Sequence, residues 1–155
     1  METDDGYTIS DDPARLDLDV VHRYLSTVSY WAQGLPRGVF ERSVAGSLCF
    51  GLYEKEGQQA GFARVVTDRA TFAWLADVFV LPAHRGRGLS KRLMAAILAH
   101  PELQRLRRFM LATWDAHGLY RQFGFEAPAR PDRLMERHQP DLYEVGRESA
   151  TAQSA

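Results

Sequence analysis

The stretch VFVLPAHRGRGLSKRL, residues 78–93, joins an apolar, strand-like run to a helix through a basic turn that contains two glycines. Gly86 and Gly88 allow the backbone to turn tightly and to approach a ligand closely. The first turn of the following helix leaves N–H groups without intrahelical partners, and such groups bind anions. Four cationic side chains surround the turn, namely Arg85, Arg87, Lys91 and Arg92. The stretch therefore predicts a site for a polyanionic cofactor.

Two other phosphate-binding turns fit this stretch less well. A Walker A loop has a lysine directly after its last glycine, whereas Leu89 follows Gly88 here. A dinucleotide-binding turn has a third glycine three residues after the second, and Lys91 stands at that position. Both nucleotide interpretations are weakened by these departures.

The turn resembles motif A of the GCN5-related N-acetyltransferases, the GNAT family, whose pattern is Gln/Arg-x-x-Gly-x-Gly/Ala after a strand. Residues 85–90, RGRGLS, match this pattern except at the last position, where Ser90 replaces glycine or alanine. The segment WLADVFVLP, residues 74–82, is also similar to a branch of small bacterial acetyltransferases within that family.

A second motif strengthens the resemblance. Residues 116–125, AHGLYRQFGF, are similar to the Ala-x-x-Leu-Tyr-x-x-x-Gly-Phe signature of the same family. In that signature the tyrosine lies near the cofactor sulfur, so the resemblance implies that Tyr120 is the general acid that protonates the leaving thiolate. The family often has asparagine seven residues earlier, where this chain has Thr113. The two motifs occur in the family's order, and the resemblance extends over residues 47–125.

The resemblance implies acetyl-CoA as the acetyl donor. Its pyrophosphate is expected over the glycine turn and the start of the helix, and its pantetheine and acetyl groups along main-chain groups of the preceding strand. The implied cofactor contacts are Phe79, Val80, Leu81, Arg85, Gly86, Arg87, Gly88, Leu89, Ser90, Lys91 and Thr113.

The remaining site residues are chosen for their chemistry. Asp77 is the only charged residue inside an apolar run that leads to the turn, so it is the candidate base, although a structural carboxylate fits the position as well. His117 is a rival base, and deprotonation through water needs neither residue. Tyr30 and Trp31, in a loop with glycine and proline, are candidates for the acceptor pocket, and Arg37 is a candidate to hold an acceptor carboxylate.

The pattern of elements predicts a single-domain mixed α/β fold. Its order is strand, two helices, three strands, helix, strand, helix and two late strands, the last two near Phe125 and at residues 134–137. The expected GNAT-like fold has a twisted sheet of about seven strands flanked by about four helices. The domain is expected to span residues 1–148, followed by a disordered tail at 149–155, which is small and polar.

Composition narrows the partners. The net charge of −1 and the pI near 6.5 do not support binding to nucleic acid or to an anionic membrane. The single cysteine, Cys49, lies in a strand-like run and is expected to be a buried apolar residue in a cytoplasmic protein. The spacing of the histidines predicts no metal site, and a homodimer is compatible with the sequence.

The sequence favours an acetyl-CoA-dependent N-acetyltransferase that acts on a small-molecule amine, which could be similar to an amino acid. Ser90 and Thr113 depart from the family pattern, so a catalytically silent acyl-CoA-binding regulatory module is an alternative. The retained Tyr120 favours the enzyme. Acetylation of a protein or peptide is a third hypothesis.

Overall fold

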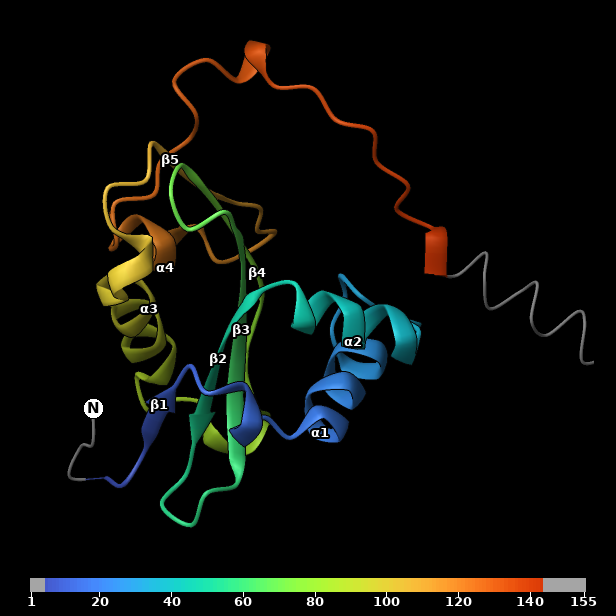
Figure 1. Ribbon diagram of the computed structural model, residues 1–155, viewed down its shortest axis with the longest axis vertical. Coiled ribbons are helices and arrows are strands. Elements are labelled where there is room, and N and C mark those ends of the chain that lie inside the picture. The colour runs from blue at the N-terminus through green and yellow to red at the C-terminus, as the bar shows by residue number, and fades with distance from the viewer. Residues whose placement is uncertain (1–4, 144–155) are drawn as a thin grey trace, which may run out of the picture.

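A five-stranded sheet forms the centre of the chain in the computed structural model, which describes residues 5–143 (Figure 1). The strands lie in sequence order, with β1 at one edge and β5 at the other. They are β1 (Thr8–Ser10), β2 (Leu48–Tyr53), β3 (Gln59–Thr67), β4 (Phe72–Val80) and β5 (Arg108–Leu111). Neighbouring strands are antiparallel except for β4 and β5, which are parallel. The connection from β4 to β5 is therefore a crossover, and it contains the glycine turn.

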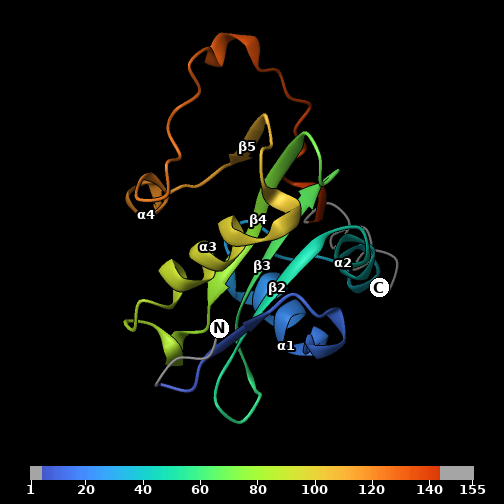
Figure 2. The same ribbon diagram turned by 60° about the vertical axis from the view of Figure 1, so that its left-hand side comes forward.

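Two helices lie on each face of the sheet, as Figures 1 and 2 show. One face carries α1 (Leu18–Arg23), which continues as a π-helical turn (Tyr24–Val28), and α2 (Arg37–Ala45). The other face carries α3 (Leu89–Ala99) and α4 (His117–Arg121). Short 3-10 turns begin at Pro13, Pro82, Pro101 and Pro131, where proline supplies the φ angle of a first helical position.

The sheet separates two apolar clusters. On the α3 side, Leu93, Met94 and Ile97 pack against β2, β3 and β4, because they recur on one face of the helix. On the α1 and α2 side, Phe40 and Leu25 pack with side chains from the opposite face of the same strands. Burial of both faces fixes the position of β4, the strand that leads to the glycine turn.

The predicted order of elements is confirmed from the first strand to α4, but the strand count is lower than expected. Neither late strand forms: the chain is irregular around Phe125 and again over residues 134–137. Pro128 and Pro131 lack the backbone N–H that a ladder needs, and no neighbouring strand of the described chain lies in register with this segment. The sheet thus has five strands in place of about seven. The predicted tail at 149–155 lies outside the described residues, as do residues 1–4.

Candidate active site

Strands β4 and β5 separate where the glycine turn approaches. Within the described residues their pairing ends at Leu75 and Leu111, while β4 continues to Val80. Beyond that point the edge of β4 that faces β5 has no strand partner, although its other edge stays paired with β3. Phe79 and Val80 are buried and Leu81 is half-buried. These three predicted contacts therefore lie at the gap where β4 has lost its β5 partner, although the Val80 carbonyl accepts a hydrogen bond from Arg85 and the Leu81 N–H donates one to the Ala60 carbonyl.

The glycine turn has the geometry that its sequence predicts. Gly86 and Gly88 adopt φ angles of 80° and 72°, in the left-handed region that favours glycine. No atom lies within 4 Å of the place where a Cβ on either residue would stand. No side chain caps the N-terminus of α3, which begins at Leu89, so its first N–H groups have no side-chain partner. The turn fits a pyrophosphate group by these observations.

The four cationic side chains around the turn divide into two pairs. Arg85 donates to the Val80 carbonyl and to the Tyr24 hydroxyl, both at 2.9 Å, and so braces the end of β4. Arg92 reaches Asp5 at 2.8 Å and ties down the N-terminal segment. Arg87 and Lys91 are exposed beside the glycines. The positive charge available to an anion at the turn is therefore carried mainly by these two residues.

Asp77 lies at a β-bulge. The register between β3 and β4 shifts near this residue, and its φ angle of 56° is unusual for a residue other than glycine. Its Oδ2 accepts a hydrogen bond from Arg64 Nε at 2.8 Å, and its Oδ1 accepts one from Trp31 Nε1 at 2.8 Å. The side chain of Asp77 is only 11% exposed. Such strain at a buried carboxylate is typical of functional sites, and the first consequence here is a fixed position for the Trp31 indole.

Three aromatic side chains gather at the mouth of the gap. Tyr30 packs edge-to-face against Trp31 and against Trp114, with ring centroids 5.0 and 5.1 Å apart. The Tyr30 hydroxyl accepts a hydrogen bond from the Trp114 backbone N–H at 3.3 Å, which connects the loop after α1 to the chain after β5. All three side chains are exposed, Trp114 by 75%. We call Tyr30, Trp31 and Trp114 the aromatic wall.

Tyr120 is the buried residue of α4. Burial raises the pKa of its hydroxyl, and the electrostatic effects of Tyr30 and Asp115 raise the pKa further. A raised pKa keeps the hydroxyl protonated, as a general acid requires. Tyr120 also lines a cavity with Thr113, the residue before Trp114 of the aromatic wall.

Other predicted residues have structural partners. The Thr113 hydroxyl accepts a hydrogen bond from the Ala116 backbone N–H at 3.1 Å, at the start of α4. His117 is exposed on α4. Arg37 forms ion pairs with Asp19 at 2.7 Å and with Glu41 at 2.9 Å on the surface of α1 and α2. The structure therefore does not bring Arg37 into contact with Asp77 or the aromatic wall.

Two residues of this neighbourhood were missing from the sequence prediction. Arg64 lies in β3 and pairs with Asp77 in the adjacent strand. The sequence does carry a signal for this pair: β3 and β4 are apolar strands with one charged residue each, and opposite charges in neighbouring apolar strands are expected to pair. Trp114 gave no comparable signal, because its role follows from where β5 ends.

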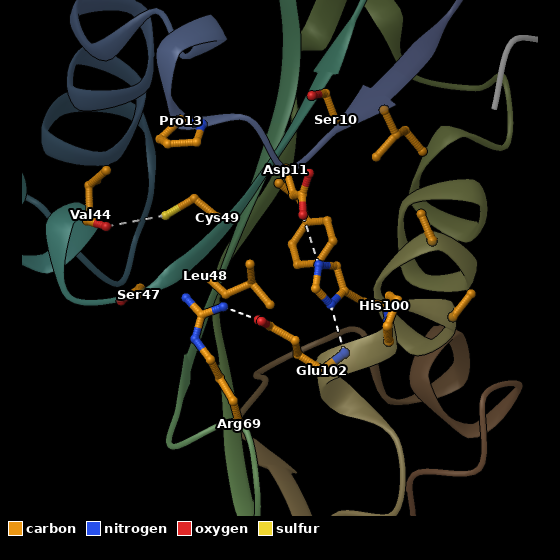
Figure 3. Close-up of a pocket in the computed structure, with 15 residues that line it drawn as sticks. Ser10, Asp11, Pro13, Val44, Ser47, Leu48, Cys49, Arg69, His100 and Glu102 are labelled. Atoms are coloured by element: carbon orange, nitrogen blue, oxygen red, sulfur yellow. Dashed lines mark hydrogen bonds and ion pairs between the residues drawn. The ribbon is translucent and has the colours of Figure 1, made fainter.

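A separate cavity of about 810 Å³ lies at the other end of α3, between that helix and strands β1 and β2 (Figure 3). Its charged side chains face one another: His100 hydrogen-bonds to Asp11 at 2.8 Å, and Arg69 pairs with Glu102. Cys49 lines the cavity, and its Sγ points to the Val44 carbonyl. No predicted site residue is among those that line it.

Cys49 is a free, buried residue, as predicted. Burial raises the pKa of its thiol to about 12, so the thiolate that a nucleophile or metal ligand needs is absent near neutral pH. Within residues 5–143 no three metal-ligating side chains of the His, Cys, Asp or Glu type come together. Over the same residues, every helix is too short or too polar to cross a bilayer.

Comparisons with known proteins agree with this geometry. Residues 46–127, more than half of the chain, match the family described as the acetyltransferase (GNAT) domain. The fungal protein FG08082 of Gibberella zeae, which carries the name of an acetyltransferase, is 35% identical to this chain over 136 residues. The match covers 74% of this chain and 75% of the fungal protein.

Solved structures show the same fold. A GNAT-family protein of Xanthomonas campestris pv. campestris is 54% identical with a TM-score of 0.86, over 88% of this chain and 96% of that one. A protein of Clostridium acetobutylicum, whose crystal structure includes acetyl-CoA, shares the fold at 14% identity with a TM-score of 0.58, over 85% and 94% of the two chains.

The chain belongs to the GNAT family of N-acetyltransferases. It is accordingly an acyltransferase that uses acetyl-CoA as its donor. The similar proteins come from a fungus as well as from bacteria, so the resemblance is not confined to a bacterial branch.

Proposed function

We propose that the protein transfers the acetyl group of acetyl-CoA directly to the amine of a small molecule, with Tyr120 as the general acid. The observation that carries the proposal is that Tyr120, a buried tyrosine of α4, lines one cavity together with residues 108–113 at the end of β5, and that burial raises its pKa. A proton donor in that place serves a thiolate that leaves from a thioester bound in the gap.

The donor is held by main-chain groups more than by side chains in this proposal. The N–H groups of the glycine turn and of the start of α3 bind the pyrophosphate, assisted by Arg87 and Lys91. The backbone of residues 79–81 lies along the pantetheine and orients the thioester. Arg85 acts indirectly, since it braces Val80 and Tyr24. Ser90 stands beside the pyrophosphate, where its hydroxyl can donate a hydrogen bond.

The transfer needs three changes at the reacting atoms. The neutral amine nitrogen forms a bond to the acetyl carbonyl carbon, the C–S bond breaks, and the sulfur takes a proton from the Tyr120 hydroxyl. The amine loses a proton, and the phenolate of Tyr120 regains one from solvent. Polarisation of the carbonyl by main-chain N–H groups of β4 stabilises the charge that develops on its oxygen.

Two residues stay candidates for removal of the amine proton. The carboxylate of Asp77 was predicted as the base, and its position near the gap is consistent with that role. Its two oxygens already accept hydrogen bonds from Arg64 and Trp31, which favours a positioning role. A chain of water molecules or the exposed His117 then removes the proton.

The acceptor is proposed to bind at the aromatic wall. Exposed rings of Tyr30, Trp31 and Trp114 offer faces for an apolar body or for an ammonium group before it loses its proton. An amino-acid-like acceptor needs a partner for its carboxylate as well. Arg37 was predicted for that role, and to fulfil it Arg37 must leave its ion pairs with Asp19 and Glu41.

An acceptor panel with purified protein tests the proposal, with release of free thiol from acetyl-CoA as the readout. We expect turnover with one class of small amines that depends on Tyr120. Binding of acetyl-CoA with no thiol release on any small amine would support the silent regulatory module instead. Turnover on peptides alone would favour the protein-acetylating alternative.

A further inference from the structure

Tyr24 contacts both the glycine turn and the strand that leads to it. Its hydroxyl accepts a hydrogen bond from Arg85 Nη2 at 2.9 Å. Its ring stacks on the ring of Phe79, with the centroids 4.0 Å apart and an angle of 15° between the planes. Tyr24 is buried, so these two contacts fix the position of its ring. Any movement of Arg85 is therefore transmitted to the residue with which the π-helical turn begins.

The π-helical turn connects Tyr24 to the aromatic wall. The Tyr24 carbonyl accepts a hydrogen bond from the Ser29 N–H at 2.9 Å. Ser29 is buried, and its Oγ donates to the Leu25 carbonyl at 2.6 Å and accepts from the Ala32 N–H at 3.1 Å. Ser29 and Ala32 thus hold both ends of the short segment that contributes two side chains to the wall. Turns of this kind are rare, and they are frequent at functional sites.

We propose that Tyr24 is a positioning residue that couples the donor site to the acceptor site, so that a pyrophosphate on the glycine turn orders the aromatic wall. The places of the two substrates in this inference rest on the proposed function. Arg85 is exposed, and its guanidinium is held by hydrogen bonds to the Val80 carbonyl and the Tyr24 hydroxyl. A pyrophosphate over the turn lies next to this guanidinium and restrains it. The restraint passes to Tyr24 and, through the π-helical turn, to the wall.

A wall that the donor has ordered binds the acceptor more tightly. A loop with exposed aromatic side chains loses conformational freedom when it packs on a ligand, and this loss opposes binding. Donor binding that has already restrained the loop removes part of that cost, which gives positive cooperativity. The hydrogen bond from Trp31 to Asp77 anchors the wall to the sheet and does not involve the turn. The link through Tyr24 is therefore the one that responds to the donor.

Tryptophan fluorescence of the full chain tests the coupling without an acceptor and without turnover. The probe is phosphoadenosine diphosphate, the nucleotide half of CoA, which carries the pyrophosphate but lacks the pantetheine that would touch the wall directly. Two of the three tryptophans belong to the wall, and Trp31 is 40% exposed. We expect the probe to lower the quenching of this fluorescence by acrylamide in the parent. Trp31→Phe should remove most of that change, which assigns it to the wall.

Two variants break the link at different points. Tyr24→Phe keeps the stacked ring but loses the hydroxyl, so it should bind the probe as the parent does, through the glycines, Arg87 and Lys91, with no change in quenching. Arg85→Lys keeps the charge, but one ammonium group does not reproduce the two hydrogen bonds of the guanidinium, and the response should be lost as well. Tyr53→Phe removes a buried hydroxyl that has no hydrogen-bond partner among the described residues. This matched control should respond as the parent does.

Calorimetric titration of the probe separates failure of the coupling from failure of the proposed donor site. A quenching response that survives in Tyr24→Phe and Arg85→Lys would overturn the coupling alone. Binding of the probe to the parent without any change in quenching would have the same meaning. A parent to which the probe does not bind would overturn the donor site at the glycine turn, and the coupling with it.

Discussion

The two ends of α3 differ: a cavity lies beside its C-terminal end, whereas the predicted cofactor contacts of the glycine turn lie at its N-terminal end. The cavity beside His100 has a volume of about 810 Å³, but its charged groups are paired with one another. At the other end, the glycine turn and the gap between β4 and β5 present backbone N–H groups and two exposed cations to solvent. The difference teaches that the availability of polar groups, more than volume, distinguishes a candidate binding site.

The two ends of α3 show the same contrast in their capping. At its C-terminal end, His100 Nδ1 accepts a hydrogen bond from the Glu102 backbone N–H. The His100 side chain therefore caps the 3-10 turn that follows the helix. At its N-terminal end no side chain caps the free backbone N–H groups that follow Gly88. With eleven residues the helix is about 16 Å long. Substitutions at the two ends therefore report on separate regions.

The largest effect is expected for Tyr120→Phe. Loss of a general acid lowers kcat by about 10²- to 10⁴-fold, while the phenyl ring keeps its packing and the affinity for acetyl-CoA changes little. Because burial raises the pKa of Tyr120, the alkaline loss of activity in the parent should fall above the ordinary tyrosine value of about 10. Steady-state kinetics over pH measure both effects.

Tyr53→Phe is the matched control for that variant, because the Tyr53 hydroxyl is buried without a hydrogen-bond partner among the described residues. Its kcat should equal that of the parent. An unchanged kcat in Tyr120→Phe, with chemistry shown to limit the rate, would remove Tyr120 from the role of acid.

The second prediction concerns the glycine turn. Gly88→Val should weaken acetyl-CoA binding by about 100-fold or more, so that a thermal shift seen at a concentration of about 100 Kd disappears. The side chain of valine fills the open space over the turn where the pyrophosphate is proposed to bind, and the φ angle of 72° adds about 1–2 kcal/mol of backbone strain.

Gly57→Val separates the strain from the binding effect. Gly57 has a φ angle of 92° and open space around its Cβ position, but it lies in the hairpin between β2 and β3. Gly57→Val should lose about as much stability as Gly88→Val and should keep the full rise in melting temperature with acetyl-CoA. Retention of the shift in Gly88→Val would move the anion site away from this turn.

A smaller effect is expected for Asp77→Asn. If Asp77 acts by holding Trp31, this variant and Trp31→Phe should both raise the acceptor KM by roughly threefold to tenfold. Asn has one acceptor oxygen for the two donors Arg64 and Trp31, and Phe has no N–H to donate. If Asp77 is the base, kcat should fall by about 10²-fold or more in Asp77→Asn alone. The ratio of kcat to KM effects in the two variants distinguishes the roles.

Arg37→Ala should have a weaker effect still. The KM for an acceptor with a carboxylate should rise by a few-fold, because exposed ion pairs contribute little, and the KM for acetyl-CoA should stay the same. Arg42→Ala on the same helix is the control and should change neither value. Equal acceptor KM values in Arg37→Ala and the parent would assign Arg37 to its structural ion pairs with Asp19 and Glu41.

Most of the fold was predictable because local signals suffice for it. Apolar periodicity predicted α3, and the positive φ angles of Gly86 and Gly88 follow from the need for a turn between strand and helix. The partners of Arg85 and Arg92 were not predictable, since both depend on residues at the other end of the chain. The late strands near Phe125 and at residues 134–137 failed for a related reason: a strand-like pattern does not say which edge of a sheet pairs with it.

The smallest effect is expected at the larger cavity, and it tests the comparison most directly. His100→Gln removes the ion pair with Asp11 but leaves a side chain able to hydrogen-bond. Because the Asp11 carboxylate is 52% exposed, the loss of stability should be below about 1 kcal/mol. The kcat, both KM values and the shift with acetyl-CoA should match those of the parent. A raised acceptor KM in His100→Gln would place acceptor binding in this cavity. Cavity volume would then indicate the position of the binding site better than unpaired polar groups do.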